Sequence, residues 1–155
     1  MSLSSMRLAM AEAVAADGDL RSWCVLTYGR EHSVYLDVDL RDPPGEDACP
    51  YVVISSIGQS AAQDRPFKEY FFGVLCIVHE DSDVISIHDN LYMHAGGENA
   101  EVFRKLVETA AAGVLVNETL GVDVDADAVG EFPFIRSEML LKITSPVLIG
   151  EDPLE

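Results

Sequence analysis

Metal binding is the first chemistry that the sequence offers, because histidines and acidic residues gather between positions 79 and 94. The possible ligands are His79, His88, His94, Glu80, Asp81 and Asp89. A zinc site needs three or four such groups within about 2.0–2.3 Å of one ion, and these spacings match no common ligand pattern. We predict ordinary histidines of turns and strand ends, with no metal and no cofactor. A metal-dependent enzyme, such as a hydrolase, is kept as an alternative.

A second acidic motif, D-x-D-x-D, begins like a calcium-binding loop. It consists of Asp123, Asp125 and Asp127. An EF-hand would continue with glycine at position 128 and glutamate at position 134, where this chain has Ala128 and Phe134. The motif therefore predicts a solvated acidic turn, with weak cation binding as the alternative.

Two further carboxylates, Asp37 and Asp39, lie on one predicted strand and point the same way, since side chains alternate along a strand. Such a pair can do general acid–base chemistry when burial or its neighbour raises one pKa. An exposed acidic sheet face accounts for the pair equally well. We favour that interpretation.

The three cysteines give no sign of nucleophilic chemistry or of disulfides. Cys24, Cys49 and Cys76 are odd in number, widely spaced and without a C-x-x-C pair, which indicates reduced thiols. Cys76 lies in an apolar run, where a thiolate is disfavoured. The sequence also lacks a G-x-S-x-G, a P-loop and a G-x-G-x-x-G motif. We predict no catalytic residues and no enzymatic activity.

Composition limits the remaining function classes. The 155 residues carry a formal net charge of −17 and are 48% hydrophobic, which suits one folded domain over 1–155 with an acidic tail at 145–155. A pI near 4.3 disfavours specific nucleic-acid binding. No apolar run approaches the roughly 18–20 residues of a membrane span, and the N-terminus does not resemble a signal peptide. We expect a soluble protein made in the cytoplasm.

Hydrophobic periodicity predicts the elements that must position these residues. Ser4 or Ser5 is expected to cap a first helix, and a second opens after Gly96-Gly97 and ends at Gly113 or Gly121. The predicted elements are a helix at 5–16, strands at 34–40, 51–57 and 68–79, a short extra strand at 84–87, the second helix, and a strand at 134–144. Loops are expected at 42–47 and 59–66.

The resulting order, α-β-β-β-α-β, predicts the α+β class, with an antiparallel-rich mixed sheet of about four strands and two helices packed on it. The third strand is apolar on both sides, with alternating residues such as Phe72 and Val74 on one side and Phe71 and Leu75 on the other. Such a strand is covered on both faces, either within the fold or by another subunit. We expect subunit contacts there and at the loops 42–50 and 59–66.

A short motif accompanies this order of elements. A Pro-Pro-Gly loop at 43–45 is followed by the strand segment 49–54, Cys-Pro-Tyr-Val-Val-Ile. The combination resembles the tail-completion proteins of long-tailed bacteriophages and prophages, in particular the lambda-type tail terminator family (minor tail protein U-like).

This resemblance implies a non-catalytic structural protein that forms a ring, commonly a hexamer, at the end of the tail tube. Its partners would be further copies of itself and phage tail-tube or head-completion proteins, and it would be incorporated in the virion. An acidic lumen would let DNA pass without sticking. A small regulatory or chaperone-like domain that binds a basic partner through its acidic face remains the other non-enzymatic alternative.

Overall fold

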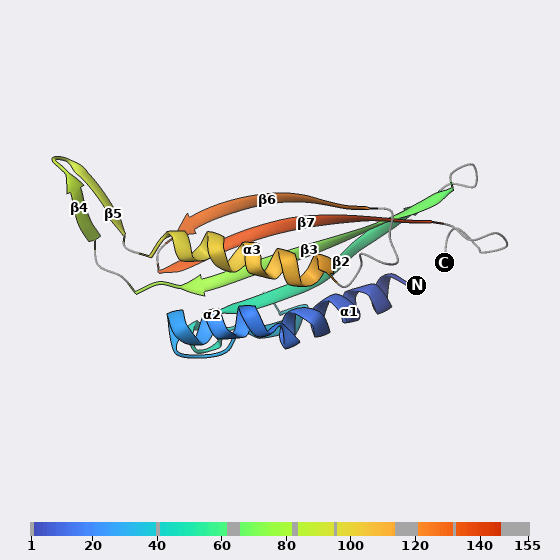
Figure 1. The fold of residues 1–155 in the computed structure, drawn as a ribbon, viewed down its shortest axis with the longest axis horizontal. Coiled ribbons are helices and arrows are strands. Elements are labelled where there is room, and N and C mark those ends of the chain that lie inside the picture. The colour runs from blue at the N-terminus through green and yellow to red at the C-terminus, as the bar shows by residue number, and fades with distance from the viewer. Residues whose placement is uncertain are drawn as a thin grey trace.

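The computed structural model describes residues 2–39, 41–61, 66–81, 84–94, 96–113, 121–131 and 133–146. Within them, a layer of helices covers one face of a five-stranded sheet, and a two-stranded hairpin projects beyond one end of it (Figure 1). The helices are α1 (Leu3–Ala16), α2 (Gly18–Tyr28), α3 (Glu98–Gly113) and the short 3-10 helix η1 (Glu46–Ala48). The sheet contains β1 (Ser33–Leu36), β2 (Tyr51–Ala61), β3 (Phe67–His79), β6 (Gly121–Glu131) and β7 (Phe134–Pro146), and the hairpin contains β4 (Val84–His88) and β5 (Leu91–His94).

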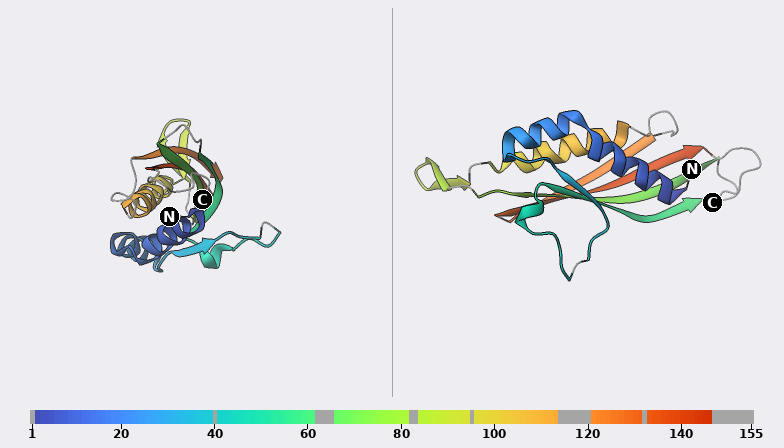
Figure 2. Two further views of the ribbon diagram at one scale, coloured as in Figure 1. Left: turned by 90° about the vertical axis from the view of Figure 1, so that its right-hand side faces the viewer. Right: turned by 90° about the horizontal axis from the view of Figure 1, so that it is seen from below.

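The strand order of the sheet is β1-β2-β3-β7-β6, with β3 at the centre. β1 runs parallel to β2, and all other neighbours are antiparallel. Figure 2 shows that the sheet curls around the helices, so we call the helix-covered face the inner face and the opposite one the outer face. The α+β class and the antiparallel-rich mixed sheet are confirmed. The predicted order and strand count are wrong, because α2, β5 and β6 were not expected.

The hydrophobic core lies between the inner face of the sheet and the helices. Alternating residues of β3 point into it and are at most 2% exposed: Tyr70, Phe72, Val74, Cys76 and Val78. The helices contribute residues at helical spacing that are 0% exposed: Met6, Met10, Val14, Phe103 and Val107. The Phe103 ring also stacks on Trp23, with centroids 6.2 Å apart. The predicted amphipathic faces of the first and last helices are therefore the faces that pack.

The helical layer begins earlier and contains one more helix than expected. Ser2, rather than Ser4 or Ser5, caps α1 and forms a reciprocal capping box with Ser5. Asp17 then ends α1 and caps α2 through its side chain. Gly18, which follows the helix predicted at 5–16, is the first residue of α2, because the chain turns at Asp17 and starts a new helix at once.

β1 is shorter than the predicted strand at 34–40. It ends at Leu36, and Asp37 has a φ of +70°, a left-handed conformation that aspartate tolerates better than most residues. The next residues leave the sheet. The expectation that Asp37 and Asp39 share one strand face is therefore wrong.

Two further boundaries can be compared with the prediction. β2 continues to Ala61 past a bulge between Ser56 and Gly58, so the first three residues of the predicted loop at 59–66 belong to the strand and pair with β3. α3 ends at Gly113, which is one of the two ends that the sequence offered. Most of the predicted acidic tail, 147–155, lies outside the described residues.

The acidic turn predicted at Asp123–Asp127 is wrong, because these residues belong to β6. Val122 and Val124 alternate with the aspartates and pack against the core from the inner face. The aspartates point to the outer face, where acidic side chains remain hydrated. Period-two alternation therefore determines this strand, and the resemblance to a calcium loop is a by-product of it.

The second apolar side of β3 is partly covered by the chain itself. Ile77 is only 7% exposed and packs on the outer face with Cys49, Tyr51 and Val53. Phe71 and Leu75 remain half-buried. Another copy of the chain is therefore not needed along the whole of β3.

Candidate functional site

Several exposed apolar residues lie together on the hairpin β4–β5, residues 84–94, which we call the arm. Within the described part of the chain, β4 and β5 pair only with each other. Figure 1 shows the arm extending away from the sheet, between the end of β3 and the start of α3. The arm is therefore an extension of the fold and not part of its core.

One face of the arm is aliphatic. Ile85 pairs with Met93, and Ile87 and Leu91 follow on the same side of their strands. Their exposed fractions are 45% for Ile85, 53% for Ile87, 57% for Leu91 and 36% for Met93. An isolated two-stranded hairpin is at best marginally stable in water, and such clustered apolar exposure marks an interaction surface.

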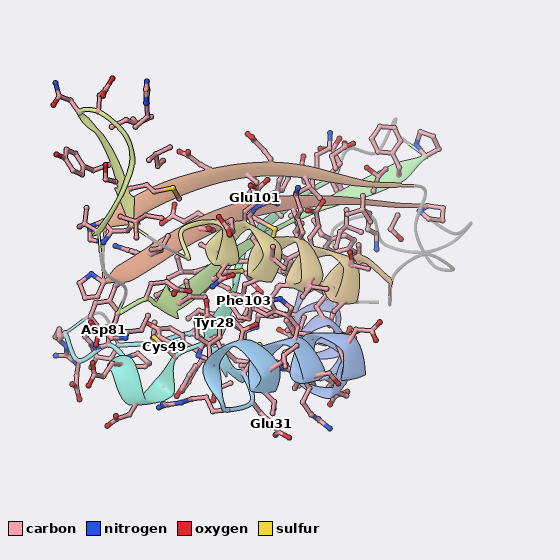
Figure 3. The ribbon with its side chains drawn as sticks, turned by 60° about the vertical axis from the view of Figure 1, so that its left-hand side comes forward. Tyr28, Glu31, Cys49, Asp81, Glu101 and Phe103 are labelled. Carbon is pink, nitrogen blue, oxygen red and sulfur yellow. The ribbon has the colours of Figure 1, made fainter. Side chains whose placement is uncertain are left out.

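The arm has a fixed root at Glu80. Tyr28 Oη at the end of α2 donates a hydrogen bond of 2.5 Å to Glu80 Oε1, and Asn99 Nδ2 of α3 donates one of 3.2 Å. The Glu80 backbone N–H donates to the Pro133 carbonyl at 2.7 Å. Burial and the contact with Glu80 raise the pKa of Tyr28 well above its ordinary value, so this phenol stays a donor. Figure 3 shows Tyr28 between α2 and α3.

Gly96 completes the root from the other side. A Cβ at this position would lie 2.8 Å from Glu80 Oε2, and the residue has a φ of +83°. Both facts favour glycine here. The arm therefore leaves the body in a direction set by polar contacts to two helices.

The outer face of the sheet carries a second candidate surface, a shallow groove of about 650 Å³ that we call the outer groove. Its floor includes Val53, Ile57, Leu75 and Leu140. Ile57 is 63% exposed and Leu140 is 40% exposed. The Ile57 side chain lies over Gly73, where a Cβ would be 3.5 Å from its Cδ1.

Carboxylates surround this apolar floor. The acidic residues lining the outer groove are Asp37, Asp125, Asp127 and Glu138. Asp123, Asp125 and Asp127 form a row along β6, which we call the acidic row. Asp123 forms an ion pair of 3.3 Å with Lys142. Since β6 is an edge strand, this acidic row also disfavours pairing with the edges of other strands.

The candidate metal ligands between positions 79 and 94 are spread over the structure. His79 at the end of β3 pairs with Glu46 at 3.2 Å and packs against Phe134, while His88 lies beside Asp89 at the turn of the arm. His94 is at the opposite end of the arm, where β5 ends. Across the described ranges, no three side chains of His, Cys, Asp or Glu are grouped closely enough to hold a metal ion.

The predicted carboxylate pair is separated as well. Asp37 binds Arg7 of α1 at 2.6 Å, and Asp39 binds Arg41 at 3.0 Å. The hydrogen bonds from Arg41 hold the pKa of Asp39 below its ordinary value. Each carboxylate therefore pairs with its own arginine, and the two carboxylates do not form the pair that general acid–base chemistry would need.

All three cysteines are free and buried. Burial raises the pKa of Cys24 to about 12, that of Cys49 to about 11 and that of Cys76 to about 12. A thiol in such surroundings is almost entirely protonated at neutral pH and is a poor nucleophile.

We therefore expect the native thiols to resist a disulfide reagent such as DTNB near neutral pH, and all three to react once the chain is unfolded. Because the thiol pKa values are higher in the folded chain than in the unfolded one, they also predict a pH-dependent free energy of unfolding. The contribution of the thiols is complete below pH 9.0, the ordinary pKa of a thiol, and is lost as the pH rises toward 12. Thiol titration and pH-dependent urea unfolding measure both effects. A thiol that reacts rapidly in the folded protein would contradict this assignment.

The turn of the arm has a recognisable signal in the sequence. Asp89-Asn90 is a two-residue turn between the apolar runs at 85–87 and 91–93, which is a hairpin pattern. Asp89 has a φ of +43°, as such a turn requires. The exposed residues of the outer groove had no comparable signal, because burial on the outer face depends on the neighbouring strands.

No helix within the described ranges has both the length and the apolar character to span a membrane. No protein-family model matches the sequence, and no curated protein matches it. Among solved structures, a chain of the structure described as "Virion of native gene transfer agent (GTA) particle" is similar, with a TM-score of 0.50 and 18% sequence identity. The match covers 91% of this chain and 94% of that chain, and it shows a shared fold over nearly the whole length of both.

Proposed function

We propose that this protein is a non-catalytic structural subunit of a phage-type particle, whose copies form a ring that terminates or completes the tail tube. The arm carries the proposal: an aliphatic hairpin surface with no cover within the described residues needs a macromolecular partner. The likeness to a chain of a gene transfer agent virion supports the particle assignment. The partners would be other copies of this chain and tail-tube or head-completion proteins.

The charge of the chain suits a subunit through which DNA passes. The chain carries 27 acidic residues against 10 basic ones, a formal net charge of −17, and the acidic row of β6 accounts for only a small part of it. A channel lined by carboxylates repels the phosphate backbone and so prevents adhesion of DNA. In such a ring, carboxylates that are not in subunit contacts would face the channel or the solvent.

Electron microscopy of the purified full-length protein tests the proposal. We expect closed rings of one size, at a concentration where light scattering reports a single assembled species. Open filaments or irregular aggregates would contradict a ring, and particles of monomer size alone would contradict self-assembly.

The acidic row also favours a second candidate, a domain that binds a basic partner. In this case affinity for a lysine-rich peptide would be strong at low salt and would fall steeply as salt is added. Binding of this kind without any self-association would favour the second candidate over the ring.

A further inference from the structure

We propose that the arm of one copy lies in the outer groove of the next copy, so that the contact between neighbours is head-to-tail. This inference rests on the proposed function, because it names the partner of the arm in the assembly. It also identifies the two surfaces that must meet: Ile85, Ile87, Leu91 and Met93 on the arm, and Val53, Ile57, Leu75 and Leu140 in the groove.

The positions of the two surfaces exclude a contact within one chain. The outer groove lies across the middle of the sheet, at the paired residues Ser55, Gly73 and Leu140. The arm extends beyond the end of the sheet (Figure 1), and the contacts of Glu80 with Tyr28 and Asn99 fix its root. An arm held in this direction reaches a groove only on another molecule.

The chemistry of the two surfaces is complementary. The aliphatic face of the arm matches the apolar floor of the groove, where Ile57 and Leu140 are exposed. The arm carries two histidines, His88 and His94, and a single acidic residue, Asp89, in a half of the chain that is otherwise strongly acidic. The only carboxylate of the arm, Asp89, lies at its turn, so the four carboxylates around the groove would meet an aliphatic face that adds no negative charge of its own.

The arm and the outer groove are different surfaces. Each copy would therefore insert its arm into one neighbour and receive the arm of a second neighbour in its groove. A contact of this heterologous kind generates a ring when the rotation between neighbours closes. An arm that paired with a second arm would instead give a dimer with two-fold symmetry. The two arrangements make different predictions for mixed variants.

A complementation experiment distinguishes them. Ile87→Asp places a carboxylate on the aliphatic face of the arm, and Ile57→Asp places one in the groove, each at a largely exposed position. Light scattering should show that each variant alone is monomeric, with association weakened by about 30-fold or more. The mixture should form a one-to-one dimer, because it contains one intact arm and one intact groove that can meet.

Leu8→Asp is the matched control. Leu8 is 48% exposed, close to the 53% of Ile87, but it lies on α1 in the helical layer. This variant should assemble as the wild type does. Ile87→Ser and Ile57→Ser remove the same apolar contacts without adding charge, and thermal unfolding of every variant establishes that it is folded.

The outcomes separate this inference from the proposed function. A wild-type protein that stays monomeric overturns both. Wild-type rings that also form from Ile57→Asp, or folded monomeric variants whose mixture gives no dimer, overturn the arm-in-groove contact and leave the ring proposal standing. The arm-in-groove contact is also overturned if Leu8→Asp is the one variant that fails to assemble, since the subunit contact would then lie on the helical layer.

Discussion

Replacing residues 84–94 with a short Gly-Ser linker is expected to abolish self-association and leave the fold intact. No residue of the arm belongs to either hydrophobic cluster, and β4 and β5 form a separate sheet. The deletion removes the whole aliphatic face, so its effect on assembly should exceed that of any single substitution. Light scattering measures the mass, and thermal unfolding measures the stability of the remaining domain.

The control for this deletion retains the hairpin but replaces Ile85, Ile87, Leu91 and Met93 with threonine, a residue that favours strands. It should also be monomeric, which separates the apolar surface from the presence of the hairpin. A deletion variant that still assembles would place the subunit contact elsewhere. A deletion variant that unfolds would show that the arm contributes to the core, contrary to its exposure.

Phe103→Ala is expected to reduce the free energy of unfolding by about 3–5 kcal/mol. Phe103 of α3 is 0% exposed, belongs to the main hydrophobic core and stacks on Trp23 of α2. Removing the ring leaves a cavity that close-packed neighbours fill only in part. A loss of this size is a large fraction of the stability of a small protein, so assembly should weaken as well.

Urea unfolding measures this loss, and Val102→Ala provides the comparison. Val102 is the preceding residue of the same helix and is 38% exposed, so its truncation should change the stability by less than about 1 kcal/mol. Similar losses for the two variants would contradict the packing of α3 on the sheet.

The parts of the fold that the sequence predicted are those with one uninterrupted period. β3, β7 and α3 each bury every second residue or one helical face, and each was expected within a few residues of its observed position. α2 was not expected because only Leu20 and Cys24 are buried in it. Its start is set by the cap at Asp17, a local signal that is hard to recognise because glycine, a residue typical of helix ends, follows it at position 18.

β6 was not expected for a different reason. Its inner residues are small, so the aspartates dominate the composition of the segment and favour the interpretation as a turn. The candidate surfaces were predicted only in part: the strand at 84–87 was expected, but its pairing with 91–94 and its exposure were not. Exposure depends on what the rest of the chain leaves uncovered, which a local pattern does not contain.

The most direct test of the account is the mass of the full-length wild-type protein, measured by light scattering over a wide range of concentrations. Burial of the arm between copies predicts one closed assembly whose mass is a fixed multiple of 16.9 kDa and which dissociates only on strong dilution. A mass of 16.9 kDa at every concentration would contradict the claim that the exposed apolar surfaces of this chain are covered by further copies of itself.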